Sequence, residues 1–280
     1  MKLFYSMRFV PLSILFMFFS IPSCLLDDDM MQDPDIVQGS WHTQTLASTN
    51  VDQTFTLYVY LPHAYPRAGY LYPVFYSLDG DQKFDEVAEI VSWKIARGEM
   101  PDTMVVGIGY GDGANMRDRD YTPTNVADQP GSGGAENFYQ FIRTELIPFI
   151  DNKYQTVATR GGRFMRGHSF GGIATLYGLF FHNDIIQNFI ATSPSLWYDN
   201  LVFFDYEYNY SVNNADMDVR LFISMGSQEP IGMPVMFLAF VDQLKKRNYP
   251  NLKMKSWLID GKRHENNQDI AFEEALKWLF

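Results

Sequence analysis

The heptapeptide RGHSFGG, residues 166–172, contains a G-x-S-x-G pattern centred on Ser169. In a nucleophile elbow, this pattern follows a buried strand and opens a helix, so that the serine hydroxyl is exposed to a substrate carbonyl. The bare pattern occurs by chance in about one chain in ten of this length, so its context decides its meaning. A serine hydroxyl is a weak nucleophile until a base takes its proton, and Ser169 therefore requires a histidine partner.

His264 has the position expected of that base. It lies in the polar segment IDGKRHENN, residues 259–267, between the last predicted strand and the last predicted helix. The other four histidines lie before the core of the sheet (His42 and His63), at the far end of the helix that follows the serine (His182), and beside the serine but on the opposite side of its strand (His168). We therefore predict that His264 activates Ser169.

A third residue should orient the imidazole, and in this fold it lies between the serine and the histidine in the chain. Glu229, in FISMGSQEP, follows the penultimate predicted strand and is the favoured acid. Asp260 and Asp205 are the alternatives.

Attack on a carbonyl places charge on its oxygen, which two backbone N–H groups must stabilise. The N–H of Phe170, directly after the serine, is one candidate donor. The other should come from the loop LDGDQ, residues 78–82, where Gly80 permits a turn and the N–H of Asp81 is the predicted donor. Such a stretch is also compatible with a simple tight turn.

The elements that must position these residues are short apolar runs that alternate with helical patterns. The predicted strands lie at residues 54–62, 72–78, 104–110, 162–169, 188–195, 219–226 and 252–260, and the predicted helices at residues 84–96, 135–151, 170–181 and 270–280. Apolar runs of this kind are typical of strands covered on both faces. The sequence therefore predicts an α/β fold with a mostly parallel central sheet and helices on both faces. Ligands of such sheets bind at the carboxyl ends of the strands, where Ser169 is expected.

Composition indicates a globular, acidic protein. The chain has 280 residues, of which 46% are hydrophobic, and a formal net charge of −11. No cluster of Lys and Arg is available to neutralise phosphates, which argues against nucleic-acid binding.

The first residues have the features of an export signal. Lys2 and Arg8 precede an apolar run from Phe9 to about Ile21, which is too short to span a membrane. Cys24, the only cysteine, follows at a position that resembles a bacterial lipobox. We predict a lipoprotein signal peptide at residues 1–23, a lipidated Cys24, a tether at residues 24–37 and one domain at residues 38–280. The lipid would be the only membrane contact, and the protein would be anchored in the outer membrane or at the cell surface of a Gram-negative bacterium.

Six segments carry a family resemblance: SLDGDQKFD, GIGYGDGANMRDRDYTPT, GHSFGGIATLYGLF, SPSLWYDN, GSQE and IDGKRHENN. In this order they resemble the putative-esterase family of α/β hydrolases, and most closely its enterochelin (siderophore) esterase branch. The resemblance implies an α/β-hydrolase fold, cleavage of carboxylic esters without a metal or organic cofactor, catalysis by Ser169 and His264, and an oxyanion hole at Asp81 and Phe170. Some siderophore esterases resemble a Ser/His dyad, which leaves the role of Glu229 open.

Specificity should depend on the loop at residues 111–134 and on the segment after Ser193. Arg117 and Arg119 are predicted to hold an anionic or polyhydroxylated part of the substrate, unless they pair with a neighbouring aspartate, Asp118 or Asp120. Trp197 is predicted to contact substrate as well. The aromatic residues of segment 198–210 form either a cap over the cleft or ordinary core packing.

Three classes of function remain compatible with these residues. The favoured one is a serine esterase that acts on small-molecule esters, of siderophore, carbohydrate or aromatic type. An acyltransferase would retain the same residues and prefer an alcohol to water as acceptor. A non-catalytic surface binding protein would have no need of a serine, an acid and a histidine in this order. The sequence leaves the oligomeric state open.

Overall fold

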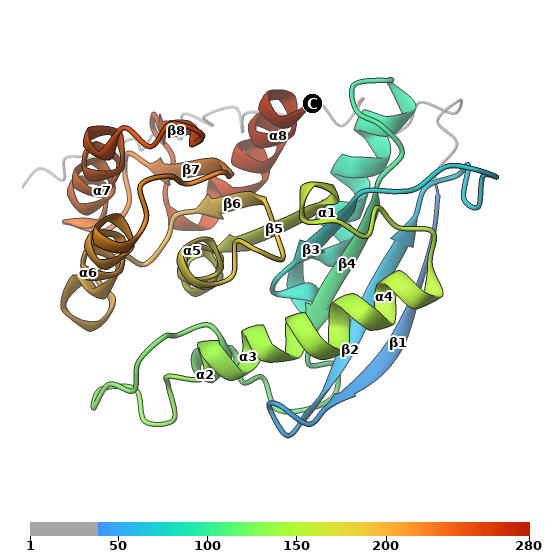
Figure 1. The fold of residues 1–280 in the computed structure, drawn as a ribbon, viewed down its shortest axis with the longest axis horizontal. Coiled ribbons are helices and arrows are strands. Elements are labelled where there is room, and N and C mark those ends of the chain that lie inside the picture. Colours follow the sequence, from blue (N-terminus) through green and yellow to red (C-terminus); the bar gives the residue numbers. More distant parts are fainter. Residues whose placement is uncertain (1–38) are drawn as a thin grey trace, which may run out of the picture. The chain divides into compact units, whose positions relative to one another are not determined.

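The computed structural model describes residues 39–280, in which eight strands form one mixed sheet (Figure 1). The strands are β1 (Ser40–Ser48), β2 (Gln53–Leu61), β3 (Val74–Ser77), β4 (Met104–Gly109), β5 (Arg163–His168), β6 (Asn188–Thr192), β7 (Arg220–Gly226) and β8 (Lys253–Ile259). Their order across the sheet is β1-β2-β4-β3-β5-β6-β7-β8. β1 and β2 are antiparallel to their neighbours, and all remaining pairs are parallel. The mostly parallel sheet predicted from the sequence is therefore confirmed.

Helices cover both faces of this sheet. They are α1 (Gly80–Ala96), α2 (Arg117–Asp120), α3 (Ala135–Phe141), α4 (Ile147–Lys153), α5 (Phe170–Phe181), α6 (Tyr198–Asn213), α7 (Met233–Arg247) and α8 (Gln268–Leu279). A π-helical turn, Ile142–Leu146, joins α3 to α4. α1 and α8 pack on one face, and α3 to α7 contribute to the core on the other. Because both faces are covered, β3, β4 and β6 are buried at every position.

Alternation along each strand separates the two cores. In β3, Phe75 belongs to the core beneath α1 and α8, whereas Val74 and Tyr76 belong to the opposite core. The same two-residue period in β5 sends Phe164 to the α1/α8 side and Met165 to the other. Consequently, every second residue of β5, up to His168, lies on the side of α1 and α8.

Four elements of the fold were not predicted from the sequence, and one of them is the four-residue helix α2. β1 was not predicted, because most residues of this edge strand, SWHTQTLAS, are polar and its apolar signal is weak. α6 and α7 were also not predicted. α6 begins with three residues at positive φ, Asp199, Asn200 and Leu201, so its start does not follow a regular helical period.

The predicted signal peptide at residues 1–23, Cys24 and the tether at residues 24–37 lie outside the described residues. Within residues 39–280, no helix is long and apolar enough to cross a membrane.

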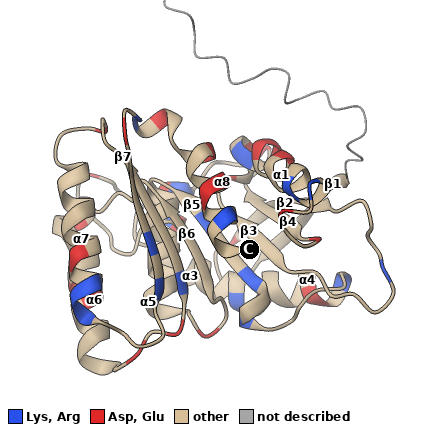
Figure 2. Ribbon diagram, turned by 90° about the horizontal axis from the view of Figure 1, so that it is seen from above, with Lys and Arg blue, Asp and Glu red and all other residues tan. Residues whose placement is uncertain are grey.

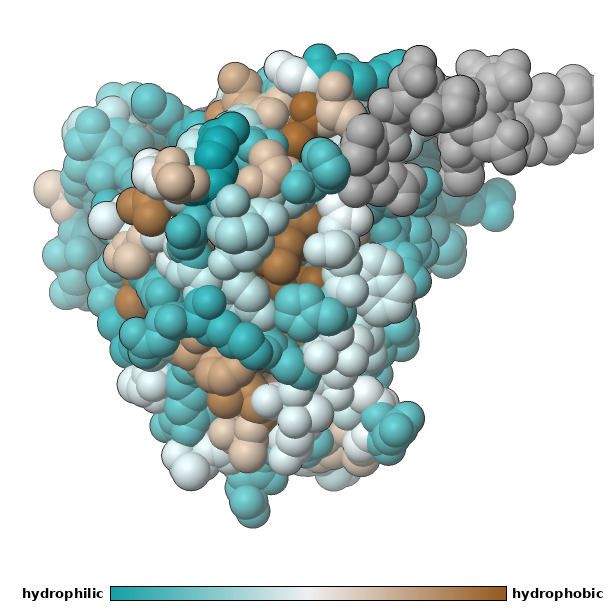
Figure 3. Space-filling model, turned by 90° about the vertical axis from the view of Figure 1, so that its right-hand side faces the viewer, coloured by the Kyte–Doolittle hydropathy of each residue, from teal (hydrophilic) through white to brown (hydrophobic). Residues whose placement is uncertain are grey.

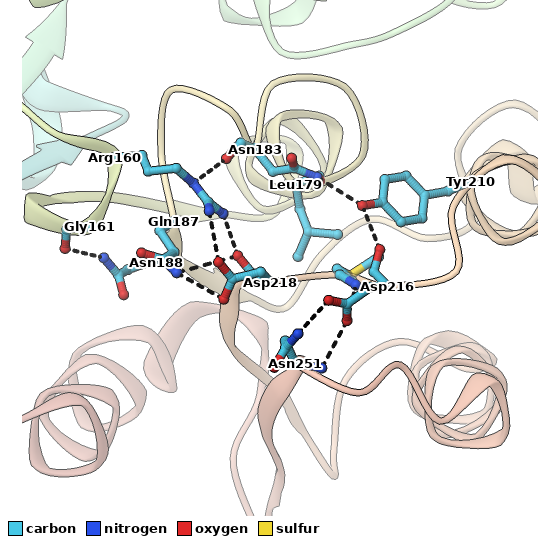
Figure 4. Close-up of polar contacts among 11 residues, drawn as sticks. Arg160, Gly161, Leu179, Asn183, Gln187, Asn188, Tyr210, Asp216, Asp218 and Asn251 are labelled. Carbon is cyan, nitrogen blue, oxygen red and sulfur yellow. Dashed lines mark hydrogen bonds and ion pairs between the residues drawn. The ribbon is translucent and has the colours of Figure 1, made fainter.

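A polar network fastens the amino ends of β5 to β8 (Figure 4). Arg160, just before β5, donates to Asp218, just before β7, at 3.0 Å. Gln187, just before β6, donates to the same carboxylate at 3.1 Å. Asp216 accepts the N–H of Asn251, before β8, at 2.9 Å. These contacts hold the strand ends in register, at the edge of the sheet opposite to Ser169.

Charged residues of both signs share the surface helices. In Figure 2, Lys and Arg positions lie among Asp and Glu positions along α1 and α7. Figure 3 shows the face on the right-hand side of Figure 1, where hydrophobic residues form small patches separated by hydrophilic ones.

Candidate active site

Ser169 forms the turn between the carboxyl end of β5 and the first residue of α5. Its backbone has φ 61° and ψ −117°, a conformation that is strained for a residue with a side chain. Gly167 makes the turn possible, because a Cβ at this position would lie 2.1 Å from the carbonyl oxygen of Gly171. The segment therefore has the strand–turn–helix form that the sequence predicts for a nucleophile elbow.

The contacts of Ser169 involve the end of β6 and the turn after it. Its N–H donates to the carbonyl oxygen of Thr192 at 3.0 Å, and its carbonyl oxygen accepts the N–H of Ser195 at 3.3 Å. The hydroxyl Oγ lies 3.3 Å from the hydroxyl Oγ of Ser195. Ser195 was not predicted as a site residue, although the sequence analysis had noted its motif, SPSLWYDN.

His264 lies in the segment between β8 and α8, at the start of a short 3-10 turn, His264–Asn266. Its Nδ1 atom hydrogen-bonds to Oε2 of Glu229 at 2.7 Å. Among the three carboxylates considered from the sequence, Glu229 is the one that contacts His264 within residues 39–280. Asp260 instead accepts a long hydrogen bond from Ser227 at 3.4 Å, and Asp205 lies in α6.

The carboxylate of Glu229 is held by three further donors. Its Oε1 accepts the N–H of Gly226 at 2.9 Å, the side-chain amide of Asn267 at 2.8 Å and the hydroxyl of Ser193. Burial raises the pKa of Glu229, but the hydrogen bonds from His264, Ser193 and the Gly226 N–H outweigh it, so the pKa lies below its ordinary value. Glu229 is therefore a fixed, ionised acceptor for the imidazole.

His168 lies directly against His264. Its ring centroid is 4.6 Å from that of His264, and its Nδ1 atom lies 3.2 Å from Oγ1 of Thr192. Burial, with help from the charges of His264 and Arg166, lowers the pKa of His168 to about 3. His168 lies on the opposite side of its strand, as predicted. That side is the α1/α8 side, which the segment carrying His264 also reaches, so His168 borders His264 instead of lying away from it.

Because His264 packs on His168, it lies beside the residue that directly precedes Ser169 in the chain. Its Nδ1 atom is engaged by Glu229, while its Nε2 atom has no side-chain partner among residues 39–280. Nε2 of His264 makes no hydrogen bond to Oγ of Ser169 in the described residues, where Oγ of Ser169 contacts Oγ of Ser195 instead.

Two helices begin next to Ser169. Phe170 is the first residue of α5, and Gly80 and Asp81 are the first residues of α1. The first N–H groups of a helix have no acceptor within it, so both helix starts present free donors. The two starts are adjacent, because a Cβ at Gly171 would lie 3.2 Å from Oδ2 of Asp79, the residue before α1.

The side chain of Asp81 points away from this junction. Its carboxylate accepts the N–H groups of Tyr110 and Gly111, at 2.6 Å and 2.8 Å, and the hydroxyl of Tyr58 at 2.8 Å. It thereby ties the start of α1 to the end of β4. The contribution of Asp81 to any oxyanion site is therefore limited to its backbone.

Both predicted substrate-binding arginines form ion pairs. Arg117 makes a bidentate contact with Asp79, with distances of 2.9 Å and 3.3 Å. Arg119 pairs with Asp120 at 2.7 Å, one of the pairings considered from the sequence. The partner of Arg117 was not predicted, since Asp79 lies 38 residues away along the chain.

Trp197 lies at the edge of the site. Its side chain is 43% exposed, and its ring centroid is 5.9 Å from that of Phe170. The hydroxyl of Tyr198 donates to the carbonyl oxygen of Thr124 at 2.6 Å, which fastens the start of α6 to the loop before α3. The aromatic segment 198–210 is thus helical and lies beside the site.

A pocket of about 410 Å³ opens beside His264, and it is lined by Gln228, Pro230, Arg263, His264 and Glu265. Within residues 39–280, no group of three or more His, Cys, Asp or Glu side chains is arranged to hold a metal ion.

Residues 48–262 match the profile of a protein family described as "Putative esterase". The chain is 34% identical over 168 residues to the ferri-bacillibactin esterase BesA of Bacillus subtilis, with 54% of this chain and 57% of the relative covered. It is 30% identical over 136 residues to a siderophore triacetylfusarinine C esterase of Aspergillus fumigatus, with 46% of each chain covered. The matched region thus spans about half the length of these curated relatives.

Solved structures resemble the fold over most of its length. The BES protein from Bacillus cereus superimposes with a TM-score of 0.78 and 26% identity, covering 87% of this chain and 97% of the other. An IroE-like serine hydrolase from Shewanella oneidensis gives a TM-score of 0.77 and 26% identity, covering 86% and 80%. These similarities confirm the predicted α/β-hydrolase fold.

Proposed function

The chain belongs to the putative-esterase family, and from this premise we propose that it is a serine esterase that cleaves carboxylic esters through an acyl-enzyme. Ser169 is the nucleophile, His264 is the base, and Glu229 orients the imidazole. The observation that carries the proposal is the 2.7 Å contact between His264 and Glu229, next to a serine in a strained strand-to-helix turn.

In acylation, Oγ of Ser169 attacks the ester carbonyl carbon, and its proton passes to Nε2 of His264. The carboxylate of Glu229 stabilises the imidazolium that forms, because it accepts the hydrogen bond from Nδ1. The tetrahedral intermediate then breaks its C–O bond to the alcohol, which takes the proton from Nε2. The acyl group remains on Ser169 as an ester.

In deacylation, water replaces the alcohol. His264 takes a proton from the water as the water oxygen attacks the acyl carbon. When the second tetrahedral intermediate breaks its C–O bond to Ser169, His264 donates that proton to Oγ of Ser169. The products are a carboxylic acid and the free enzyme, and no other reactant is consumed.

The charge on the carbonyl oxygen is stabilised by backbone N–H groups from two helix starts. Phe170 supplies one donor, and Asp81, near the start of α1, supplies the other. The proximity of Asp79 to the start of α5 supports this pairing. Because these donors are fixed by helices, they need no reorganisation when the charge develops.

Siderophore esters are the substrate class we propose first, since two relatives are named siderophore esterases. Feruloyl and acetyl esters of sugars are the second class. Arg117 and Arg119 already form ion pairs, so they contribute to substrate binding through the N–H groups that those pairs leave free. Trp197, which is exposed beside Phe170, would contact an aromatic or alkyl part of the ester.

A panel of esters tests the proposal. Purified wild-type protein and the Ser169→Ala variant would be compared on p-nitrophenyl acetate and butyrate, feruloyl and acetyl sugars, and a siderophore trilactone. We expect turnover by the wild type that the alanine variant lacks. Adding an alcohol acceptor distinguishes an acyltransferase, which would form a new ester in place of the acid. Absence of turnover on the whole panel would favour a non-catalytic binding protein.

We also propose that Cys24 is lipidated and that the lipid anchors the protein in the outer membrane or at the cell surface of a Gram-negative bacterium. The support is the sequence around Cys24. Several acyl chains on one cysteine are sufficient for stable anchoring. Mass spectrometry of the mature N-terminus should find a lipidated Cys24, and the Cys24→Ser variant should lack the lipid. An unmodified Cys24, or a chain that starts elsewhere, would refute the anchor without affecting the esterase proposal.

A further inference from the structure

The turn after β6, Ser193-Pro194-Ser195, touches both ends of the proposed catalytic machinery. We call these three residues the SPS turn. The hydroxyl of Ser193 donates to Oε1 of Glu229, and the hydroxyl of Ser195 lies 3.3 Å from that of Ser169. We propose that the SPS turn is a positioning element of this enzyme: Ser193 holds the acid and Ser195 holds the nucleophile. This inference rests on the serine-esterase function proposed above.

The backbone and the surroundings of Ser193 fix the direction of its hydroxyl group. It is fully buried, and its N–H donates to the carbonyl oxygen of Ser224 in β7 at 2.8 Å. Its φ of 45° lies in the left-handed region, which is unfavourable for a residue with a side chain. Backbone strain of this kind persists where the surrounding structure enforces it, and it is common at functional sites.

The amide of Asn267 shares the same acceptor as Ser193. Its Nδ2 atom donates to Glu229 at 2.8 Å and to the carbonyl oxygen of Arg263 at 2.7 Å. Two acceptors fix the orientation of the amide, so its Oδ1 atom faces Ser193 at 3.1 Å. A hydroxyl has one proton, and the carboxylate is the stronger acceptor, so Ser193 directs its proton to Glu229.

This arrangement restricts the carboxylate of Glu229. With Oε1 held by Ser193, Asn267 and the Gly226 N–H, the carboxylate cannot rotate, and Oε2 stays directed at His264. If one of these donors is removed, the carboxylate of Glu229 can rotate, and it then stabilises the protonated His264 less well. Ser193 therefore acts through Glu229 rather than on the substrate.

Ser195 acts at the other end of the turn. Its N–H and its hydroxyl contact the carbonyl oxygen and the hydroxyl of Ser169, both at 3.3 Å. These two contacts fix the backbone and the rotamer of the nucleophile together. Gly172 lets α5 approach the turn, because a Cβ there would lie 2.9 Å from Cα of Pro194.

A double-mutant cycle with p-nitrophenyl butyrate as substrate tests the proposal on the full chain. We expect Ser193→Ala to lower kcat about tenfold with little change in KM, since a hydrogen bond to a charged group is lost and the substrate is not touched. In a Glu229→Gln background, the same change should cost less than about twofold, because the group on which Ser193 acts is already altered. Ser195→Ala should lower kcat by a similar factor in both backgrounds.

Two further variants separate positioning from folding. Ser193→Gly also removes the hydroxyl but relieves the strain at φ 45°, so it should lower kcat by the same factor as Ser193→Ala and unfold at a higher temperature than Ser193→Ala. Ser224→Ala is the matched control: this neighbouring serine is buried, and its hydroxyl has no hydrogen-bond partner within the described residues. It should retain wild-type kcat.

The outcomes that overturn the proposal are distinct. Wild-type kcat in Ser193→Gly, or an undiminished effect of Ser193→Ala in the Glu229→Gln background, would reject the role of Ser193. Wild-type kcat in Ser195→Ala would reject that of Ser195. If Glu229→Gln itself keeps wild-type kcat, the assignment of the acid fails and the role of Ser193 fails with it.

Discussion

His168 provides a test of the site that does not depend on any substrate. Burial lowers its pKa from 6.5 to about 3, so the folded protein keeps the ring neutral at pH values where the unfolded chain protonates it. Between these two values the unfolded state binds one more proton than the folded state. The free energy of unfolding must therefore fall as the pH falls below 6.5.

The size of this effect follows from the pH interval. Each pH unit below 6.5 costs about 1.4 kcal/mol until the folded-state pKa is reached. Between pH 7.5 and 5.5, His168 should thus remove roughly 1.4 kcal/mol of stability. For a domain of this size, that loss corresponds to a decrease in Tm of about 3–6 °C.

The variant to compare is His168→Asn. Its shorter side chain can still contact Thr192, as Nδ1 of His168 does in the wild type, but it does not titrate. The free energy of unfolding would be measured by urea denaturation at pH 7.5 and 5.5 for the wild type and the variant. Other titrating groups contribute equally to both proteins, so the difference between the two pH responses isolates His168. His63→Asn, which removes an exposed histidine, controls for the loss of an imidazole.

We expect the wild type to lose about 1.4 kcal/mol more than His168→Asn over this interval. Equal losses in the two proteins would refute the burial argument. They would mean that His168 can be protonated in the folded protein, next to His264.

Three further predictions concern the geometry of the site. Glu229→Gln should lower kcat/KM at least about a hundredfold, whereas Asp260→Asn and Asp205→Asn should stay near wild type; a large loss in either aspartate variant alone would identify a different acid. Because the pKa of Glu229 and that of His168 both lie below their ordinary values, neither group should contribute to the pH dependence of log kcat/KM between pH 5 and 7, and a limiting slope of 2 in this range would contradict this. Gly172→Ala should lower both Tm and kcat although alanine normally favours a helix, because the new Cβ would lie 2.9 Å from the backbone of Pro194 and of Thr192; a Tm at or above that of wild type would show that the turn can yield.

The parts of the fold that sequence predicts well are those fixed by local pattern. The runs at residues 104–110 and 219–226 are mostly apolar because helices cover both faces of the strands, and the structure has strands there. β1 was missed because an edge strand with one exposed face carries less apolar signal. α7 was not predicted, although Phe237, Phe240 and Leu244 form a buried stripe whose helical spacing is visible in the sequence.

The site was predictable in its order along the chain but not in its contacts. Ser169 and His264 could be selected because each follows a strand at the edge where ligands bind. The contacts of Ser193 with Glu229 and Asn267 join residues 36 and 74 positions apart, and no local pattern encodes such pairs. The ion pair between Arg117 and Asp79 was not predicted for the same reason, whereas the pairing of Arg119 with Asp120, its neighbour in the chain, was among those considered.

The most direct test of the central claim is to label the protein with a fluorophosphonate probe and map the adduct by peptide mass spectrometry. The wild type should carry one adduct, on Ser169, because we propose that His264 activates this serine. His264→Gln should label far more slowly, and Ser169→Ala should not label. An adduct on another serine, or equal labelling of wild type and His264→Gln, would contradict the assignment of Ser169 and His264 as nucleophile and base.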